Sequence, residues 1–357
     1  MNIIGCDLHT RYQVVAWIEE ETGEIKTRRL EHENGEARAF YARWPRGAQI
    51  GIEATFPALW FERLLAECGH ELWVGDATRI RASEVRQQKT DTRDAEHVLD
   101  LLRTDRFPRV WVPCPADRDA RQLLQHRQKL VRMRTAVKNQ LHGLAMAQGL
   151  CRKHKLFSQA GRRLLESLEL GPWASRRRNE LLTLLDQLDP QIAELDKAVE
   201  AEAARRPEVQ LLRQQKGVGV ITALAFVLTI GPVERFARSR QLVSYLGLNP
   251  SEGSSGDHQY LGHISKQGNS MMRWLLVEAG QTAARLDVKL SRVYKHLRLR
   301  RGANVAKVAM ARRLAVRMYW ILRPAREAAP PVRMSGSSTQ SMVDPRSGSG
   351  GTTPSTL

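Results

Sequence analysis

The chain has 357 residues, a formal net charge of +18 and a pI of about 10.3. This length allows two or three domains with substantial cores, and the basic charge favours a polyanionic partner, nucleic acid first. No run of about 18 apolar residues occurs, so we expect no membrane span. The start of the chain lacks signal-peptide architecture, and four scattered cysteines without a CxxC spacing favour free thiols over zinc. We therefore expect a cytoplasmic, nucleoid-associated protein.

The first hundred residues predict an α/β layer protein. Residues 2–8, 12–20 and 23–30 are short apolar or β-branched runs typical of three strands. Further strands are predicted at 48–54 and 70–75. Helices are predicted at 34–44 and 55–69, the second opened by Thr55 and Pro57 and closed by Gly69. Three strands followed by alternating helices and strands match the order of an RNase H-like (RuvC-like) domain.

Two aspartates, Asp91 and Asp94, head a predicted helix in "KTDTRDAEHVLDLL". Three residues apart on a helix, both carboxylates point from one face. They would favour the positive end of the helix dipole, and the spacing resembles a capping box, so a helix cap is one interpretation. Asp7 and Glu53 end predicted strands, and carboxylates at strand ends together with a helix pair can hold two Mg²⁺ ions. A metal site is therefore the other interpretation.

Residues 116–206 are predicted to be nearly all helical. One apolar stripe runs from Leu130 to Leu144, among many basic residues between 121 and 142 that form our candidate contact with RNA or DNA; a solvated charged face is the alternative. A second stripe, from Leu181 to Val199, alternates steps of four and three as a coiled coil does. We expect Pro190 to interrupt it, with Asp189 capping a restarted helix. Self-association and an intrachain helical bundle fit these stripes equally well.

The third unit, from residue 207, contains two features that suggest chemistry. "KGVGVITALA" resembles a helix-hairpin-helix turn whose amides meet a phosphate, although Lys216 replaces the usual proline and a plain helix turn fits as well. "NPSEGSSGDHQYLGHISKQGNS" is predicted to be a polar Gly/Ser-rich loop. Its composition is that of a flexible linker, yet a serine there could attack a phosphodiester if it were activated.

Taken together, "GCDLH", "IGIEAT", "KTDTRDA", "KGVGVITA" and "YLGLNPSEGSSG…LGHISKQGNSMMRWLLVEA" resemble the DEDD transposases of insertion sequence family 110 and the Piv-type invertases. The resemblance runs from residue 3 to about 325. It implies a RuvC-like domain, a helical coiled-coil segment and a transposase domain with a nucleophilic serine. It also implies a homo-oligomer, a dimer or tetramer, that works with a non-coding bridge RNA pairing with both target and donor DNA.

The resemblance assigns roles to individual residues. Asp7, Glu53, Asp91 and Asp94 would form the DEDD set that binds Mg²⁺, and Ser255 would be the nucleophile, with Ser254 as the fallback. Phe56 stands where many family members have glycine. The implied reaction is strand cleavage and exchange through a phosphoserine link. Two other classes stay open: a RuvC-like nuclease that uses metal-activated water, and a non-enzymatic nucleic-acid-binding protein descended from a transposase.

The predicted domains follow from these features. Residues 1–110 would form the RuvC-like metal-binding domain, 111–206 the helical coiled-coil segment, and 207–325 a mostly α-helical transposase domain with a helix-hairpin-helix-like segment. The tail, 326–357, is rich in Ser, Gly, Thr and Pro and is predicted to be disordered.

Overall fold

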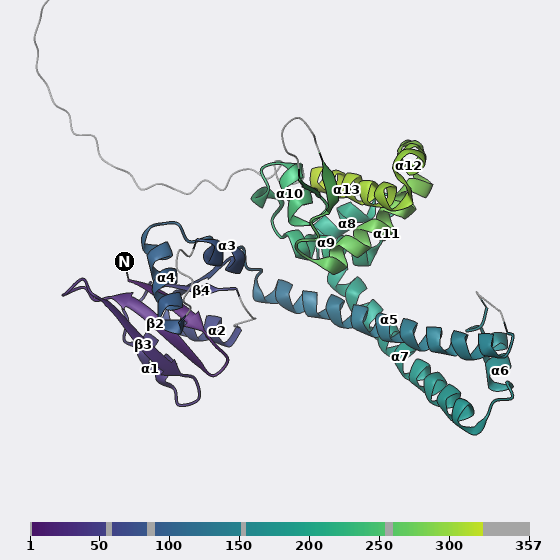
Figure 1. Ribbon diagram of the computed structural model, residues 1–357, viewed down its shortest axis with the longest axis horizontal. Helices are drawn as coiled ribbons and strands as arrows, with labels where there is room; N and C mark the ends of the chain where they lie inside the picture. The colour runs from purple at the N-terminus through teal and green to yellow at the C-terminus, as the bar shows by residue number, and fades with distance from the viewer. Residues whose placement is uncertain (1, 55–58, 84–89, 151–154, 254–259, 324–357) are drawn as a thin grey trace, which may run out of the picture. The chain divides into compact units, whose positions relative to one another are not determined.

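The computed structural model describes residues 2–54, 59–83, 90–150, 155–253 and 260–323. Its internal contacts divide the chain into two units, residues 1–115 and 116–357 (Figure 1). Within the described residues, no helix combines the length and apolar character needed to cross a bilayer. The expectation of a disordered tail at 326–357 falls outside the described residues.

The first unit contains a five-stranded mixed sheet in the order β3-β2-β1-β4-β5 (Figure 1). Strands β1 (Ile3–Leu8), β2 (Tyr12–Ile18) and β3 (Ile25–Glu31) form an antiparallel meander. Strands β4 (Gln49–Glu53) and β5 (Glu71–Gly75) extend the sheet in parallel from β1. The predicted mixed α/β sheet is confirmed, and its strand order is consistent with an RNase H-like transposase domain.

Four helices accompany this sheet: α1 (Glu36–Ala42), α2 (Leu59–Cys68), α3 (Ala77–Ala82) and α4 (Asp91–Arg103). Successive strand residues point to opposite faces of a sheet. Ile4 and Cys6 of β1 accordingly share a buried cluster with Phe40 of α1 and Phe61 of α2. The other face is covered by α4, whose Leu99 joins a cluster with residues of β2.

Two glycines let α4 approach the sheet closely. A Cβ on Gly5 of β1 would lie 2.2 Å from the carbonyl oxygen of Ala95 and 2.4 Å from the amide nitrogen of Leu99. A Cβ on Gly51 of β4 would lie 2.7 Å from a side-chain carbon of Leu102. Since real Cβ atoms do not approach backbone this closely, Gly5 is required for the observed position of α4. Asp7 lies two residues after Gly5 on the same strand, so the close contact at Gly5 also sets the distance between Asp7 and α4.

The second unit opens with a helical hairpin built mainly from α5 (Pro115–Ala147) and α7 (Pro172–Ala204), with the short α6 (Gln159–Glu166) between them. The two predicted apolar stripes meet each other in one buried cluster that joins residues of α5 to residues of α7. Arg127 pairs with Asp196, and Arg134 pairs with Asp189 at 3.3 Å, across the two helices. The stripes are thus buried within one chain.

The predicted helix restart at Pro190 is wrong, because α7 continues through it. Proline inside a helix removes a hydrogen bond and costs about 3 kcal/mol. Leu188 and Ile192, on either side of Pro190, are buried against α5, and burying such side chains offsets a cost of this size. Asp189 is not a helix cap but contacts Arg134 of α5.

The remaining elements form a mostly helical body. Its helices are α8 (Pro207–Arg213), α9 (Val220–Ile230), the 3₁₀ turn η1 (Val233–Arg235), α10 (Ser239–Tyr245), α11 (Ser270–Leu286), α12 (Val288–Arg301) and α13 (Ala303–Leu322). One large cluster joins α8, α9, α10, α11 and α13. The predicted polar loop instead begins and ends in a short antiparallel hairpin, β6 (Pro250–Glu252) and β7 (Leu261–Ile264). Only a few residues pair there, which is why composition did not reveal it.

Candidate functional site

Asp7 and Glu53 lie at the same edge of the sheet. The parallel pairing of β1 with β4 ends at Cys6 opposite Ile52, and each acidic residue is the next one along its strand. Their side chains are 18% and 24% exposed, so both carboxylates are largely desolvated. Asp7 and Glu53 are more than forty residues apart in the chain. The pairing of β1 with β4 therefore places two partly buried carboxylates at one edge of the sheet.

The cap of α4 is Thr90 and neither aspartate. The Thr90 hydroxyl accepts a hydrogen bond from the amide of Arg93 at 3.4 Å, and Asp91 and Asp94 occupy the first turn that follows. The interpretation of the two aspartates as helix caps is therefore wrong, because Thr90 accepts the capping hydrogen bond. Both aspartates still lie at the positive end of the helix dipole.

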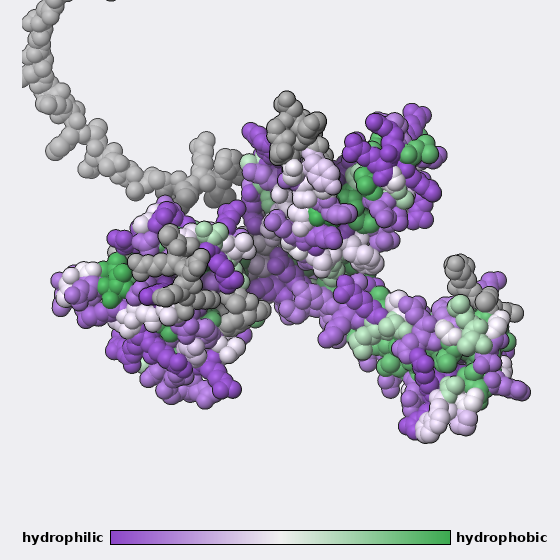
Figure 2. Space-filling view, in the orientation of Figure 1, coloured by the Kyte–Doolittle hydropathy of each residue, from purple (hydrophilic) through white to green (hydrophobic). Residues whose placement is uncertain are grey.

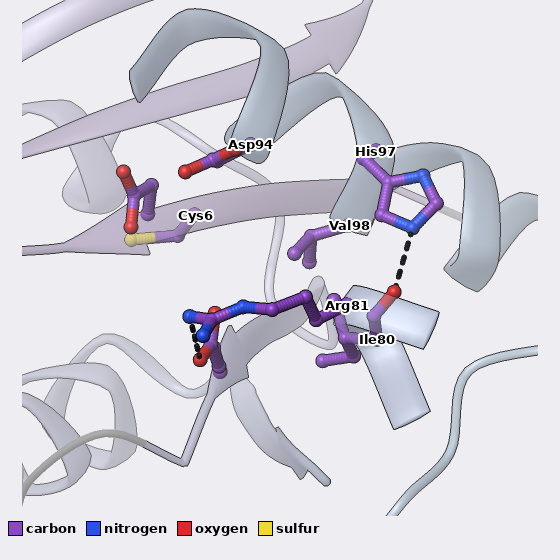
Figure 3. A pocket seen from close by; sticks show the side chains of 8 residues that line it. Cys6, Ile80, Arg81, Asp94, His97 and Val98 are labelled. Carbon is purple, nitrogen blue, oxygen red and sulfur yellow. Dashed lines mark hydrogen bonds and ion pairs between the residues drawn. The ribbon is translucent and has the colours of Figure 1, made fainter. Parts of the chain in front are cut away.

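A small pocket brings three of the four predicted acidic residues together. Asp7, Glu53 and Asp94 line it, with Arg81 from α3 facing Glu53 at 3.9 Å. Figure 3 shows Asp94 and Arg81 extending toward the end of the pocket where Cys6 lies. The remaining lining residues are Cys6, Ile80, His97 and Val98. Asp91 does not line this pocket.

Asp91 instead belongs to a second group that shares Asp7 and includes His9. One ligand atom each from Asp7, His9 and Asp91 lies within 4.8 Å of the others. The Nε2 atom of His9 is 3.0 Å from Oδ2 of Asp7 and 3.5 Å from Oδ2 of Asp91. Asp7 is thus common to both groups, which is the arrangement that a two-metal site needs.

His9 and Tyr12 were missed in the sequence. The Tyr12 hydroxyl donates a 2.9 Å hydrogen bond to Oδ2 of Asp91, the Tyr12 ring stacks on His9, and the Arg29 guanidinium lies over the same ring at 3.6 Å. The motif Asp-x-His could have revealed His9, because a residue just after a strand can face the same side as the residue two positions before it. The hydrogen bond of Tyr12 joins residues 79 positions apart, and no local pattern signals it.

The surroundings of Asp7 disfavour its charged form. Burial raises the pKa of the Asp7 carboxyl, and the carboxylates of Asp94 and Asp91 raise it further, while His9 lowers it. Beneath it, burial raises the pKa of the Cys6 thiol, which donates a hydrogen bond to Gln13 at 3.1 Å. Cys6 therefore remains a neutral thiol. The candidate ligands are carboxylate oxygens and the imidazole of His9, since the His97 ring contacts the Ile80 carbonyl. That donor set fits a hard divalent cation such as Mg²⁺ or Mn²⁺.

The predicted nucleophile Ser255 and its alternative Ser254 lie outside the described residues. The hairpin that flanks them is described, and in it Ser251 donates a hydrogen bond to the His263 carbonyl at 2.9 Å. Ser251, also present in the serine-rich segment, is therefore engaged in holding β6 to β7.

The Gly-Val-Gly turn joins α8 to α9. Gly217 has a φ of +88°, and a Cβ there would lie 2.6 Å from the amide nitrogen of Ala283 in α11. Both the backbone conformation and the close approach require glycine. Packing against α11 is thus sufficient to explain this glycine.

A mixed sheet with carboxylates at two neighbouring strand ends and at the head of a covering helix is consistent with a DEDD, RNase H-like transposase domain. Comparison with known families agrees. The family model for DEDD transposases of the IS110 type matches residues 4–147, and that of the transposase IS116/IS110/IS902 family matches residues 209–295. The chain belongs to the IS110 family of insertion-sequence transposases.

Similar proteins are also described as transposases. A probable family 20 transposase of Pseudomonas aeruginosa is 29% identical over 89% of this chain and 96% of its own length. The transposase for insertion sequence element IS1111A of Coxiella burnetii is 33% identical over 67% of each chain. The transposase for element IS1328 of Yersinia enterocolitica is 27% identical over 76% of this chain and 83% of its own.

Proposed function

We propose that this transposase cuts and exchanges DNA strands with a Mg²⁺-dependent acidic centre and a serine nucleophile. Family membership implies DNA substrates and a DNA-cleaving, recombining enzyme. The observation that carries the proposal is the convergence of carboxylates from β1, β4 and α4 around Asp7. Carboxylates gathered on both sides of Asp7 repel it, and a divalent cation is a ligand that relieves such repulsion.

Each acidic residue has a proposed task. Asp7 would be shared between two cation positions, one completed by Glu53 and Asp94 and the other by Asp91. DEDD transposases typically use divalent metal ions, which in such a site stabilise charge on a phosphoryl group and activate a hydroxyl nucleophile. Tyr12 would hold the Asp91 carboxylate in place through its hydrogen bond.

The proposed nucleophile is Ser255, with Ser254 as the alternative. Its hydroxyl oxygen would form a bond to a DNA phosphorus while the bond from that phosphorus to the 3′ oxygen breaks. The serine proton is removed, and the 3′ oxygen takes up a proton to leave as a hydroxyl. A 3′ hydroxyl of the partner strand then attacks the phosphoserine and releases the serine. The number of phosphodiester bonds is conserved, so no nucleotide cofactor is needed.

The partners proposed are donor and target DNA, a non-coding bridge RNA and further copies of the same chain. Base pairing by the RNA would choose the sequences, while the protein would hold backbones. We also propose that the leucine stripes of the α5–α7 hairpin form a coiled coil and that the Gly217 turn acts as a helix-hairpin-helix. The domain boundaries at 110, 206 and 325 are likewise proposals.

Strand exchange on paired donor and target DNA, with the bridge RNA present, tests this proposal. Ser255→Ala should abolish exchange and the covalent protein–DNA adduct, while DNA binding persists. An adduct that survives in Ser255→Ala but disappears in Ser254→Ala would move the nucleophile by one residue. Hydrolysed ends without any adduct in the wild type would instead support the nuclease alternative.

Asp91→Asn and Asp94→Asn should remove Mg²⁺-dependent activity, and full activity in both would contradict the metal assignment.

A further inference from the structure

The last two described helices, α12 and α13, are far more basic than the rest of the chain. Residues 288–323 contain eight arginines and three lysines and no aspartate or glutamate. This segment, a tenth of the chain, supplies more than half of the net charge of +18. Residues 296–323 also lie beyond the end of the matched family model. Such a one-signed segment is the electrostatic footprint of a polyanion site.

These cations have few partners within the protein. Arg317 pairs with Asp287 at 2.7 Å, and Arg323 bonds the Ala237 carbonyl. Within the part of the chain that the structure describes, the other nine form no ion pair with a carboxylate, and eight of them are exposed. The nine are Lys289, Arg292, Lys295, Arg298, Arg300, Arg301, Lys307, Arg312 and Arg313, of which only Lys307 is partly buried. Their charge is therefore available to a partner.

The basic helix first considered for nucleic-acid contact differs in this respect. In α5, the Arg121 guanidinium donates to the Leu228 carbonyl, Arg127 pairs with Asp196 and Arg134 pairs with Asp189. Lys138 lies 5.1 Å above the ring of Phe157, which His142 also contacts. Most of these groups are used to hold the second unit together. We therefore expect nucleic acid to contact α12 and α13 rather than α5.

The cations of α12 and α13 are arranged along continuous surfaces. Lys289, Arg292, His296 and Arg300 follow helical steps of three and four and are all exposed, so they form one stripe on α12. From residue 289 to 300 the stripe spans about 16 Å, the axial rise of about five DNA base pairs. Beside it runs a groove between α12 and α13, with Leu290, Leu297, Ala309 and Val316 as its apolar lining and Arg312, Arg313 and Arg317 as its charges. Figure 2 shows hydrophilic residues over most of the visible surface of α12.

We propose that α12 and α13 form a binding surface for the phosphate backbone of duplex DNA, without sequence preference. The choice of DNA rests on the proposed transposase function. Single-stranded recognition relies on several stacked aromatic rings. The α12 stripe instead consists of cations and an imidazole, and among the described residues α13 exposes a single aromatic ring, Trp320. Arginines and lysines on a helix face position a duplex by contacting phosphates and read no bases.

The test compares two triple variants of the full-length protein. Lys289→Gln/Arg292→Gln/Arg300→Gln removes three charges from α12. The control, Arg176→Gln/Lys197→Gln/Arg213→Gln, removes three exposed charges that pair with Glu180, Glu194 and Glu200. Both variants lose the same net charge. Fluorescence anisotropy in EDTA would follow binding to a 30-base-pair duplex of arbitrary sequence over a range of salt concentrations, and circular dichroism would verify folding.

The α12 variant should bind duplex DNA on the order of 10–100-fold more weakly at moderate salt, and its log–log salt slope should fall by about 2.7. The control should change the slope by less than about 1. Equal losses in both variants, or no loss in the α12 variant, would overturn the proposal. A larger loss for an RNA of the same length than for the duplex would assign the surface to RNA instead. EDTA and the absence of any cleavage step separate this result from failure of the proposed catalysis.

Discussion

The first unit and the α12–α13 pair both collect charges of one sign, but in opposite surroundings. Around Asp7 the carboxylates lie close together and are partly buried, and burial raises the pKa of Asp7. On α12 and α13 the cations are spread over two helices, and most of them are exposed. Exposed charges keep their hydration and are screened by salt, whereas buried like charges are not. The first arrangement therefore suits a small ion of high charge, and the second suits an extended polyanion.

The largest effect should come from removing one converging carboxylate. Asp94→Asn keeps the shape of the side chain and its place in the first turn of α4 but removes a proposed ligand. We expect Mg²⁺-dependent strand exchange to fall on the order of 10²–10³-fold, as when one electrostatic contact to a transition state is lost. Asp100→Asn on the same helix is the matched control, since Asp100 is partly exposed, pairs with Arg103 and Arg106 and does not line the acidic pocket. Its activity should stay within about twofold of the wild type, measured as product per unit time.

Separating α4 from the sheet should break the acidic centre without altering any charge. In Gly5→Ala the new methyl group would overlap the backbone of Ala95 and Leu99 in α4. We expect a loss of about 3 kcal/mol in the free energy of unfolding, and weaker metal binding in the fraction that folds. Gly51→Ala faces side-chain carbons of Leu102 and Val98, which can rotate, and should cost about 1 kcal/mol. Equal costs by urea denaturation would show that α4 is free to shift.

A smaller effect is expected from the residue that orients Asp91. Tyr12→Phe keeps the ring between His9 and Arg29 and removes only the hydroxyl that donates to Asp91. Loss of such an outer hydrogen bond typically weakens a metal site at least 10-fold, and we expect Mn²⁺ affinity by calorimetry to fall by about that factor. Tyr41→Phe, whose hydroxyl bonds Gln13 in the buried core, is the control that should leave affinity unchanged. Unchanged affinity in Tyr12→Phe would mean that Asp91 needs no support from β2.

The sequence predicted the layers of the first unit because strand alternation and helix stripes are local patterns. It also pointed to the carboxylates that the structure brings close to Asp7, since each lies at the end of a strand or the start of a helix. It did not predict that Asp91 would join Asp7 through His9 while Asp94 and Glu53 share the pocket, because those contacts depend on how close α4 approaches Gly5. The pairing of several α5 cations, in contrast to the exposed cations of α12, was hidden for a similar reason. Counting arginines cannot distinguish paired cations from unpaired ones.

The smallest effect concerns the stability of the protein without metal. The pKa of Asp7 is raised by burial and by the neighbouring carboxylates, so the folded state holds its proton more tightly than the unfolded state does. The stabilising contribution of Asp7 is then complete below its unfolded pKa of about 3.9 and is lost as pH rises through the raised value. In EDTA, Asp7→Asn should melt at the same temperature as the wild type or lower near pH 4, and about 2–4 °C higher at neutral pH. The control Asp100→Asn should show no such rise in melting temperature at neutral pH. An Asp7→Asn variant that is less stable than the wild type at neutral pH would contradict the proposed repulsion between the carboxylates around Asp7.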